Sequence, residues 1–155
     1  MPAIEELTKG DVIATRTIDI TRADLIRYAG ASGDFNPIHW SEATATAAEL
    51  PGVIAHGMLT MGLVVDLVSE WVNNPAAIID YQTRFSGMVP VEETTHTSDP
   101  AIPFENPNAG AQLEVVAKVG AINEDTNVVR VDLAVTNPNE DNARVLTRAQ
   151  AQVQL

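Results

Sequence analysis

The sequence of 155 residues contains no cysteine. This absence excludes disulfide bonds, thiolate zinc sites, iron–sulfur clusters and cysteine nucleophiles. Any chemistry that the chain performs therefore depends on oxygen and nitrogen groups.

Basic residues are also scarce. Nine Lys and Arg residues against 21 Asp and Glu residues give a formal net charge of −12. Such a charge repels nucleic-acid backbones and anionic lipid headgroups, so we expect no nucleic-acid and no membrane partner. Because 45% of the residues are hydrophobic and 19% are charged, the composition indicates a folded protein, with one domain over residues 1–155.

Long apolar runs and a signal sequence are absent as well. The first residues, MPAIEELTKGD, have neither the positive start nor the apolar segment of a signal peptide. The longest apolar run, near residues 62–65, is interrupted by Asp66, well short of a membrane span. We therefore expect a soluble protein of the cytoplasm.

The chain begins with a strand and a helix. Residues 11–20 are rich in β-branched residues and predict a strand. Thr21, with Asp24 three residues later, predicts a helix N-cap of the capping-box type. This helix is expected to end at Gly30.

A constrained loop and a second short helix are expected next. Residues 31–40 (ASGDFNPIHW) predict a loop, because Pro37 keeps Asn36 out of the helical region. Ser41 is typical of a helix N-cap, and its helix should end near Leu50.

The second half combines one long helix with several strands. Residues 57–73 are apolar on almost every side, which predicts a helix buried all round. Residues 76–85 predict a strand, and three later segments alternate with period two, which indicates an antiparallel meander. Their expected inward-facing residues are Leu113, Val115, Ala117, Val119 and Ala121, then Val129, Val131, Leu133 and Val135, then Val145, Thr147, Ala149, Ala151 and Val153. The order of elements predicts an α+β fold, with an antiparallel sheet around a long central helix. Three prolines in residues 92–110 predict a long loop there.

The first candidate site combines Asp34 and His39, which are joined by a segment that Asn36 and Pro37 stiffen. A carboxylate and an imidazole that face the same space can polarise one water molecule and transfer its proton near neutral pH. The alternative is structural: Asp34 forms an Asx turn and His39 fills the edge of a pocket.

The second candidate site is His56-Gly57, at the start of the long helix. A glycine N–H at a helix start allows close approach and stabilises a developing oxyanion. The alternative is that Gly57 only lets the chain turn and that His56 caps or packs. Asp66 and Glu70, one turn apart, are interpreted as the polar edge of the helix rather than as a catalytic pair.

Two segments carry a family resemblance. Residues 28–39 (YAGASGDFNPIH) and 55–59 (AHGML) resemble the hydratase-2 motif of the MaoC-like (R)-specific enoyl-thioester hydratases and dehydratases. Within this family the chain resembles in particular the β subunits of the mycobacterial-type (3R)-hydroxyacyl-ACP dehydratases, where ACP is acyl carrier protein. The long segment 92–110, which includes His96, departs from the family pattern. It leaves acyl-chain length and access open, and His96 is expected to be a surface residue.

The resemblance implies a hot-dog fold and the reversible hydration of trans-2-enoyl thioesters of CoA or ACP to (3R)-hydroxyacyl thioesters. It implies that Asp34 and His39 form the catalytic dyad and that the Gly57 amide contacts the thioester carbonyl. Supporting or substrate-binding roles are expected for Asn36, His56 and Arg84. No metal and no organic cofactor is expected.

Partners and alternatives follow from the same resemblance. A homodimer is expected, and a heterodimer with a related hot-dog subunit is the alternative. A non-catalytic acyl-thioester-binding or dimer-supporting subunit is a second functional hypothesis, and a hot-dog thioesterase is a third. Because an anionic carrier needs local positive potential, Arg22, Arg27 and Arg84 are candidates for its binding.

Overall fold

The computed structural model describes residues 2–94 and 110–155. The chain forms two compact units. We call Met1–Ile18, Met61–Gly87 and Leu113–Leu155 the sheet unit, and Asp19–Thr60 with Met88–Gln112 the helical unit. The expectation of a single domain over residues 1–155 stays a prediction.

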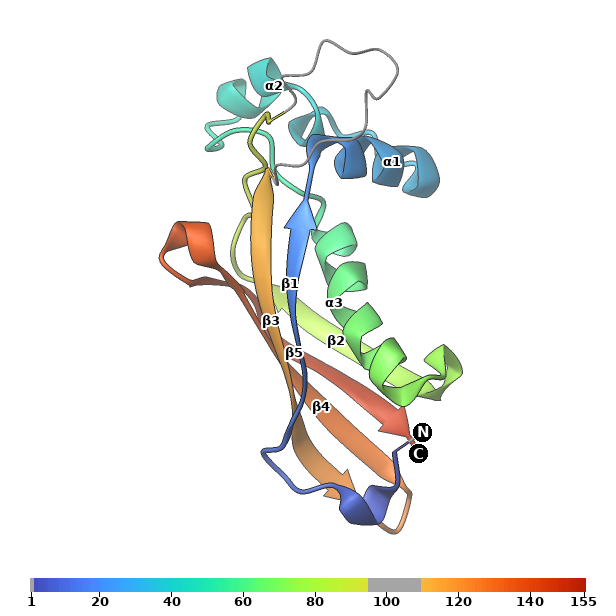
Figure 1. The fold of residues 1–155 in the computed structure, drawn as a ribbon. Helices are drawn as coiled ribbons and strands as arrows, with labels where there is room; N and C mark the ends of the chain where they lie inside the picture. The colour runs from blue at the N-terminus through green and yellow to red at the C-terminus, as the bar shows by residue number, and fades with distance from the viewer. Residues whose placement is uncertain (1, 95–109) are drawn as a thin grey trace. The chain divides into compact units, whose positions relative to one another are not determined.

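The sheet has five strands in the order β1-β3-β4-β5-β2 (Figure 1). Strands β3, β4 and β5 form the predicted antiparallel meander, and β2 pairs antiparallel with β5. With a helix against the sheet, this is the expected α+β, hot-dog architecture. The strands are β1 (Val12–Ile20), β2 (Ile78–Phe85), β3 (Ala111–Asn123), β4 (Val128–Asn137) and β5 (Ala143–Gln154).

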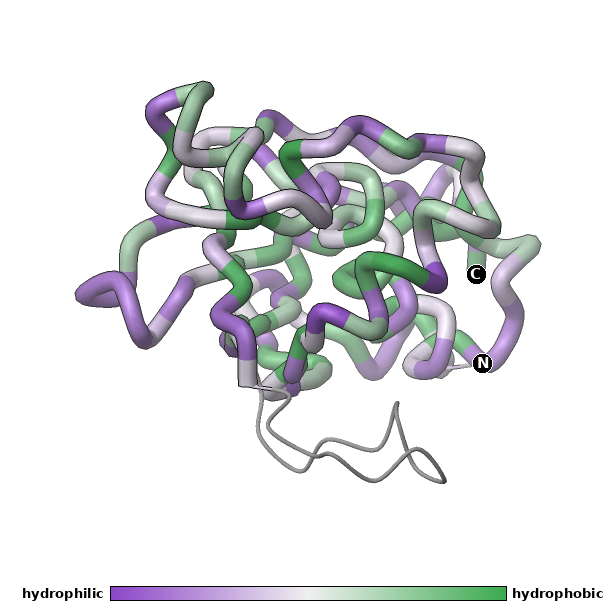
Figure 2. The backbone as a smooth tube through the Cα atoms, turned by 90° about the horizontal axis from the view of Figure 1, so that it is seen from above, coloured by the Kyte–Doolittle hydropathy of each residue, from purple (hydrophilic) through white to green (hydrophobic). Residues whose placement is uncertain are grey.

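Apolar and polar residues that alternate with period two explain the meander, because successive side chains of a strand point to opposite faces of the sheet. Figure 2 shows that hydropathy changes repeatedly along the backbone. The four inward-facing residues predicted for β4 are all buried. In β3 the register shifts between Val119 and Ala121, so Ala121 is only half-buried, against expectation. In β5, Leu146 is buried and Thr147 is not. The prediction for Thr147 was wrong because a bulge precedes Ala149, which shifts the alternation by one residue.

Helix α3 (Gly57–Val72) has nearly the predicted bounds, but it is not buried all round. Met58, Gly62, Asp66 and Glu70 are exposed. They follow one another at intervals of four residues and therefore form a single stripe on the helix. Within the sheet unit, Arg16 of β1 forms ion pairs with Asp66 and Glu70, so these carboxylates are a polar edge, as predicted.

A half-buried tyrosine connects α3 to the sheet. The Tyr81 hydroxyl on β2 donates a hydrogen bond of 3.1 Å to the carbonyl of Met61. Burial raises the pKa of Tyr81 to about 12, so this side chain stays a neutral donor.

In the helical unit, α1 (Arg22–Ser32) begins as predicted. The Thr21 side chain accepts a hydrogen bond from the Asp24 N–H, and the Asp24 carboxylate accepts one from the Thr21 N–H. The expected end at Gly30 was wrong. The helix continues to Ser32 because Gly33, with φ of +78°, takes the left-handed conformation that ends it.

Helix α2 (Glu42–Ala47) is shorter than expected. Ser41 caps it, accepting a hydrogen bond from the Thr44 N–H, but it ends at Ala47 and not near Leu50. In the part of the chain that the structure describes, four short 3₁₀ helices complete the secondary structure: η1 (Ile4–Glu6), η2 (Pro37–His39), η3 (Pro75–Ala77) and η4 (Pro138–Glu140).

Two extended segments of the helical unit lie antiparallel. The Ala55 N–H donates to the Val89 carbonyl and the Val91 N–H donates to the Val53 carbonyl, both at 2.8 Å. The predicted loop of residues 92–110 lies mostly outside the described residues, and so does His96. Within residues 2–94 and 110–155, every helix is too short or too polar to cross a membrane.

Candidate active site

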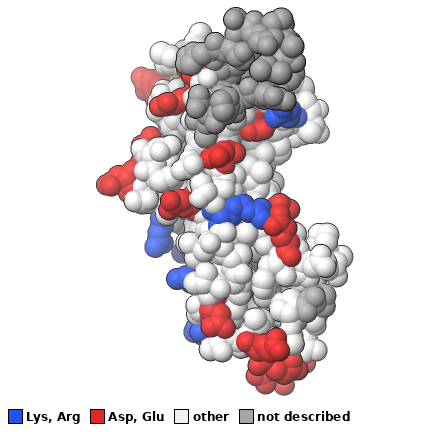
Figure 3. Space-filling view, in the orientation of Figure 1, with Lys and Arg blue, Asp and Glu red and all other residues white. Residues whose placement is uncertain are grey.

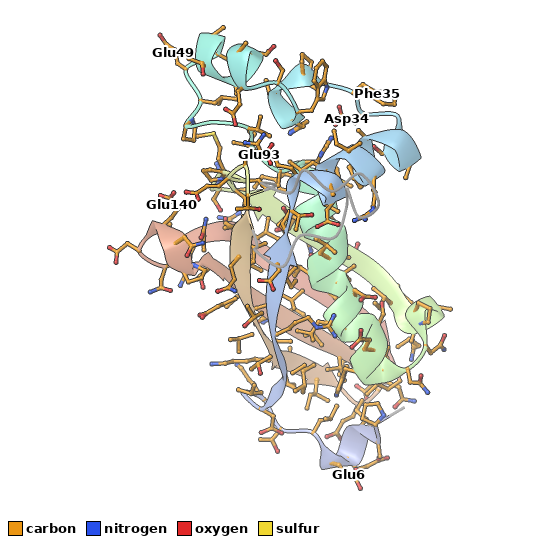
Figure 4. The ribbon with its side chains drawn as sticks, turned by 45° about the horizontal axis from the view of Figure 1, so that its top comes forward. Glu6, Asp34, Phe35, Glu49, Glu93 and Glu140 are labelled. Atoms are coloured by element: carbon orange, nitrogen blue, oxygen red, sulfur yellow. The ribbon has the colours of Figure 1, made fainter. Side chains whose placement is uncertain are left out.

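The loop after α1 is fixed by its own polar side chains. The Asp34 N–H donates to Ser32 Oγ at 3.1 Å. The Asp34 carboxylate accepts the Asn36 N–H at 3.2 Å, and Asn36 Oδ1 accepts the Ile38 N–H at 3.3 Å, which begins η2. Asp34 does form the Asx turn that was considered as its structural role, and it remains exposed at the loop (Figure 4).

His39 is the buried member of the predicted pair, with 8% of its surface exposed. Its Nδ1 lies 2.7 Å from the Ile54 carbonyl oxygen. A carbonyl oxygen only accepts hydrogen bonds, so Nδ1 carries the proton and donates it. The neutral ring therefore keeps a lone pair on Nε2, which is the atom that can act as a base.

His56 is buried still more completely, with 1% of its surface exposed. Its ring stacks on that of His39, with centroids 3.8 Å apart and planes at 24°. The Tyr28 ring meets its edge at 4.8 Å. His56 Nε2 donates to the backbone carbonyl of Asp34 at 3.1 Å, so one imidazole contacts both ends of the Asp34–His39 segment.

The electrostatic environment keeps His56 neutral. Burial lowers the pKa of His56, and the nearby His39 lowers it further, whereas the bond to the Asp34 carbonyl and the Asp34 charge oppose this shift. In the neutral ring Nδ1 is unprotonated, and it has no hydrogen-bond partner among the described residues. His56 is thus a fixed neighbour of His39 whose neutral form is favoured.

The structure brings most of the predicted site residues together. Ligand atoms of Asp34, His39 and His56 all lie within 4.8 Å of one another. Gly57 follows directly and is the first residue of α3, where a backbone N–H has no partner inside the helix. Arg84 is an exposed residue of β2 in the sheet unit.

The same three side chains are chemically able to hold a cation. Two imidazoles and a carboxylate are a common donor set for zinc, and each histidine here has one ring nitrogen outside its bond to a carbonyl. The expectation that the site needs no metal stays a prediction, and metal analysis of the purified protein tests it.

Two contributors were missed from the sequence. The Ile54 carbonyl selects the tautomer of His39, and the Tyr28 ring packs on His56. A backbone carbonyl has no side-chain signature, so no sequence signal points to Ile54. Tyr28 lies at the start of the recognised motif, but its contact with His56 spans 28 residues and has no local pattern.

Exposed apolar side chains adjoin Asp34 and His39 in the chain. Phe35 and Trp40 are 63% and 50% exposed, and Trp40 Nε1 donates to the Phe35 carbonyl at 3.1 Å. Figure 4 shows Phe35 next to Asp34 on the loop that follows α1. The loop therefore presents apolar surface directly next to its carboxylate.

Comparison with known proteins gives consistent matches. The profile of the family described as a MaoC like domain matches residues 4–124. The fatty acid synthase β subunit of Cochliobolus carbonum is 45% identical over 64 residues, which are 40% of this chain and 3% of that protein. The 3-hydroxybutyryl-CoA dehydratase of Methylorubrum extorquens is 35% identical over 65 residues, which are 42% of this chain and 41% of that protein.

A solved structure resembles the whole chain. A MaoC-like dehydratase superposes with a TM-score of 0.82 and 31% sequence identity, covering 99% of this chain and 42% of that one. The chain thus spans less than half the length of each of these three proteins.

Proposed function

The chain belongs to the MaoC-like domain family, and from this premise we propose that it adds water reversibly to trans-2-enoyl thioesters to give (3R)-hydroxyacyl thioesters. The observation that carries the proposal is the pairing of His39 and Asp34 within 4.8 Å, with His39 Nδ1 bonded to the Ile54 carbonyl, so that Nε2 is the ring atom available to act as a base. No step of this reaction requires a metal or an organic cofactor.

In the dehydration direction, His39 Nε2 removes the proton from C2 of the 3-hydroxyacyl thioester. The electrons of that C–H bond pass to the thioester oxygen as an enolate, and they return to form the C2–C3 double bond as the C3–O bond breaks. The proton taken by His39 passes through Asp34 to the departing hydroxyl, which leaves as water. Hydration is the reverse: Asp34 orients the water that attacks C3. General acid–base groups of this kind contribute about 10²–10⁴-fold to a rate.

Loss of the C2 proton places negative charge on the thioester oxygen. The Gly57 N–H, at the positive end of α3, is the proposed donor to that oxygen. Since glycine has no side chain, the carbonyl can approach this N–H closely.

His56 and Asn36 are proposed as positioning residues. Asn36 fixes the short segment between the two dyad residues through its bond to the Ile38 N–H. His56 contacts the His39 ring and the Asp34 carbonyl, and as a neutral residue it adds no charge that would compete for protons. Arg84 is proposed to contact the anionic part of the CoA or ACP carrier.

We propose a homodimer as the assembly, because β2 is an edge strand of the sheet with exposed Ile79 and Phe85. Light scattering on the purified chain tests this directly. A monomer that gains mass only with a related hot-dog subunit would favour the heterodimer.

The reaction is tested by hydration of crotonyl-CoA, followed by loss of the enoyl absorbance. Asp34→Asn and His39→Ala are each expected to lower kcat by about 10²–10⁴-fold, because each removes one proton-transferring group. Matched controls are Asp80→Asn, on the exposed face of β2, and His96→Ala, both with kcat unchanged.

The unfolding temperature of each variant shows whether its fold is intact. Full activity in either dyad variant would contradict the mechanism. Binding of crotonyl-CoA without turnover by the unmodified chain would favour the non-catalytic subunit, and release of free CoA thiol from acyl-CoA would favour the thioesterase.

A further inference from the structure

The basic residues of the sheet unit are concentrated at one hollow over β3, β4 and β5. The hollow has a volume of about 410 Å³. Asp132 is the acidic residue in its lining, so five cations and one carboxylate leave a net charge of +4 there, in a chain of −12. Figure 3 shows Lys and Arg side chains along one margin of the surface. The five cations, out of nine in the chain, are Lys9, Lys118, Arg130, Arg144 and Arg148.

Three of the four cations outside the basic hollow are paired with carboxylates, and Arg84 is the exception among the described residues. Outside the hollow, Arg16, Arg22 and Arg27 each form an ion pair with at least one carboxylate. Inside it, Arg130 is paired with Asp132, at 2.8 and 3.1 Å. Among the described carboxylates, none lies within 4.0 Å of the other four cations. Four like charges close together repel one another, and a bound anion would relieve that repulsion.

Two irregularities of the sheet build the hollow. At the bulge in β3, a Cβ on Gly120 would lie 2.3 Å from Asp132 Oδ2, so glycine leaves the space in which Asp132 holds the Arg130 guanidinium. At the bulge in β5, Arg148 has φ of +50°, in the left-handed region, and its side chain is exposed. A bulge changes the direction of a side chain, and here the redirected residue lines the hollow.

The floor of the hollow is largely apolar. Val116, Ala134 and Leu146 line it together with the cations, and so do Thr136 and Thr147. Guanidinium groups bind phosphate oxygens with two parallel hydrogen bonds, and an apolar floor suits a ring or a short chain. A volume of about 410 Å³ falls within the range of small-molecule sites. We propose that the basic hollow binds an organic phosphate of nucleotide type, with its phosphates on the cations and its base on the floor.

Calorimetric titration with ADP and with adenosine 3′,5′-bisphosphate tests the site. The double variant Lys118→Gln/Arg148→Gln should weaken binding of both at least tenfold, and Arg144→Gln is an independent second variant. All three side chains are exposed, so the fold should persist, and the unfolding temperature verifies this. The matched control is Arg16→Gln, which removes a charge from the same unit outside the hollow. The affinity of this variant for both ligands should stay within twofold of the unmodified protein.

Titration with CoA and the KM for crotonyl-CoA identify the source of the phosphate. A double variant with weaker CoA binding and a raised KM at unchanged kcat would assign the hollow to the nucleotide end of CoA. Weaker ADP binding with unchanged CoA binding would assign it to a free nucleotide.

Three outcomes would overturn the proposal: no binding of ADP by the unmodified protein, equal loss of affinity in Arg16→Gln, or inorganic phosphate bound as tightly as ADP. The proposal would also be overturned if the protein bound an acidic protein through the hollow and bound no nucleotide there. Because ADP binding is measured without turnover, this test is independent of the proposed enzyme activity.

Discussion

The helical unit and the sheet unit are held together by different kinds of interaction. In the sheet unit, alternating strands bury rows of Val, Leu and Ala side chains, and long ladders of backbone bonds fix the register. In the helical unit, side-chain caps and turns fix successive short segments of the chain. The residues that make them are Thr21, Ser32, Asp34, Asn36 and Ser41.

Because of this difference, we expect the residues that determine stability to be different from those that determine the chemistry. Apolar burial is insensitive to the direction of each group, whereas a cap or turn places one polar atom at one distance. The candidate catalytic groups lie in the unit whose local geometry is set by polar bonds. We therefore expect substitutions in the sheet to change the free energy of unfolding, and substitutions in the loop to change kcat.

The largest expected effect on stability is in the sheet. Leu113 is fully buried on β3, and Leu113→Ala should lower the free energy of unfolding by about 2–5 kcal/mol, because it leaves a cavity. Urea unfolding measures this change. Val12→Ala, on an exposed side chain of β1, should change it by less than about 0.5 kcal/mol. A kcat per folded molecule that falls with Leu113→Ala would contradict the separation.

The next effect concerns pH. The pKa of His56 is lowered from 6.5 in the folded protein, so below pH 6.5 the unfolded chain binds more protons at this residue. The free energy of unfolding should therefore fall as the pH decreases from 6.5 toward the lowered pKa. His56 contributes at most about 1.4 kcal/mol per pH unit to this slope.

Urea unfolding between pH 5 and 7.5 measures the slope, and His56→Gln should remove the contribution of this residue. His96→Gln, the matched histidine substitution, should retain it. A protein that becomes more stable on acidification through this range would contradict a buried neutral His56.

The smallest expected effect is at the cap of α1. Thr21→Ala removes the side-chain oxygen that accepts the Asp24 N–H, and should cost about 1 kcal/mol of stability. Thermal unfolding measures this, and Thr21→Ser, which keeps the hydroxyl, is the conservative control. If α1 positions the loop that carries Asp34, Thr21→Ala should also lower kcat. A cap variant with reduced stability and unchanged kcat would show that the loop keeps its geometry without the cap.

Several features could be predicted because they depend on near neighbours in the chain. The cap at Thr21, the start of α3 at Gly57 and the alternation of β4 all follow from residues within a few positions. Other features depend on long-range contacts, among them the bulge that made the prediction for Thr147 wrong. The bulge in β5 and the pairing of Arg16 with Asp66 and Glu70 depend on neighbouring elements, which no local pattern records.

The sequence by itself determined the α+β class, the antiparallel meander and the family, because periodicity, caps and a twelve-residue motif are local properties of the chain. The roles of the site residues stay predictions. Tertiary structure alone decided three things: that the Ile54 carbonyl leaves His39 Nε2 free, that His56 stacks on His39, and that five scattered cations meet at one hollow. The physical reason is that each needs groups brought together from distant parts of the chain, and only the folded backbone sets the distances between them.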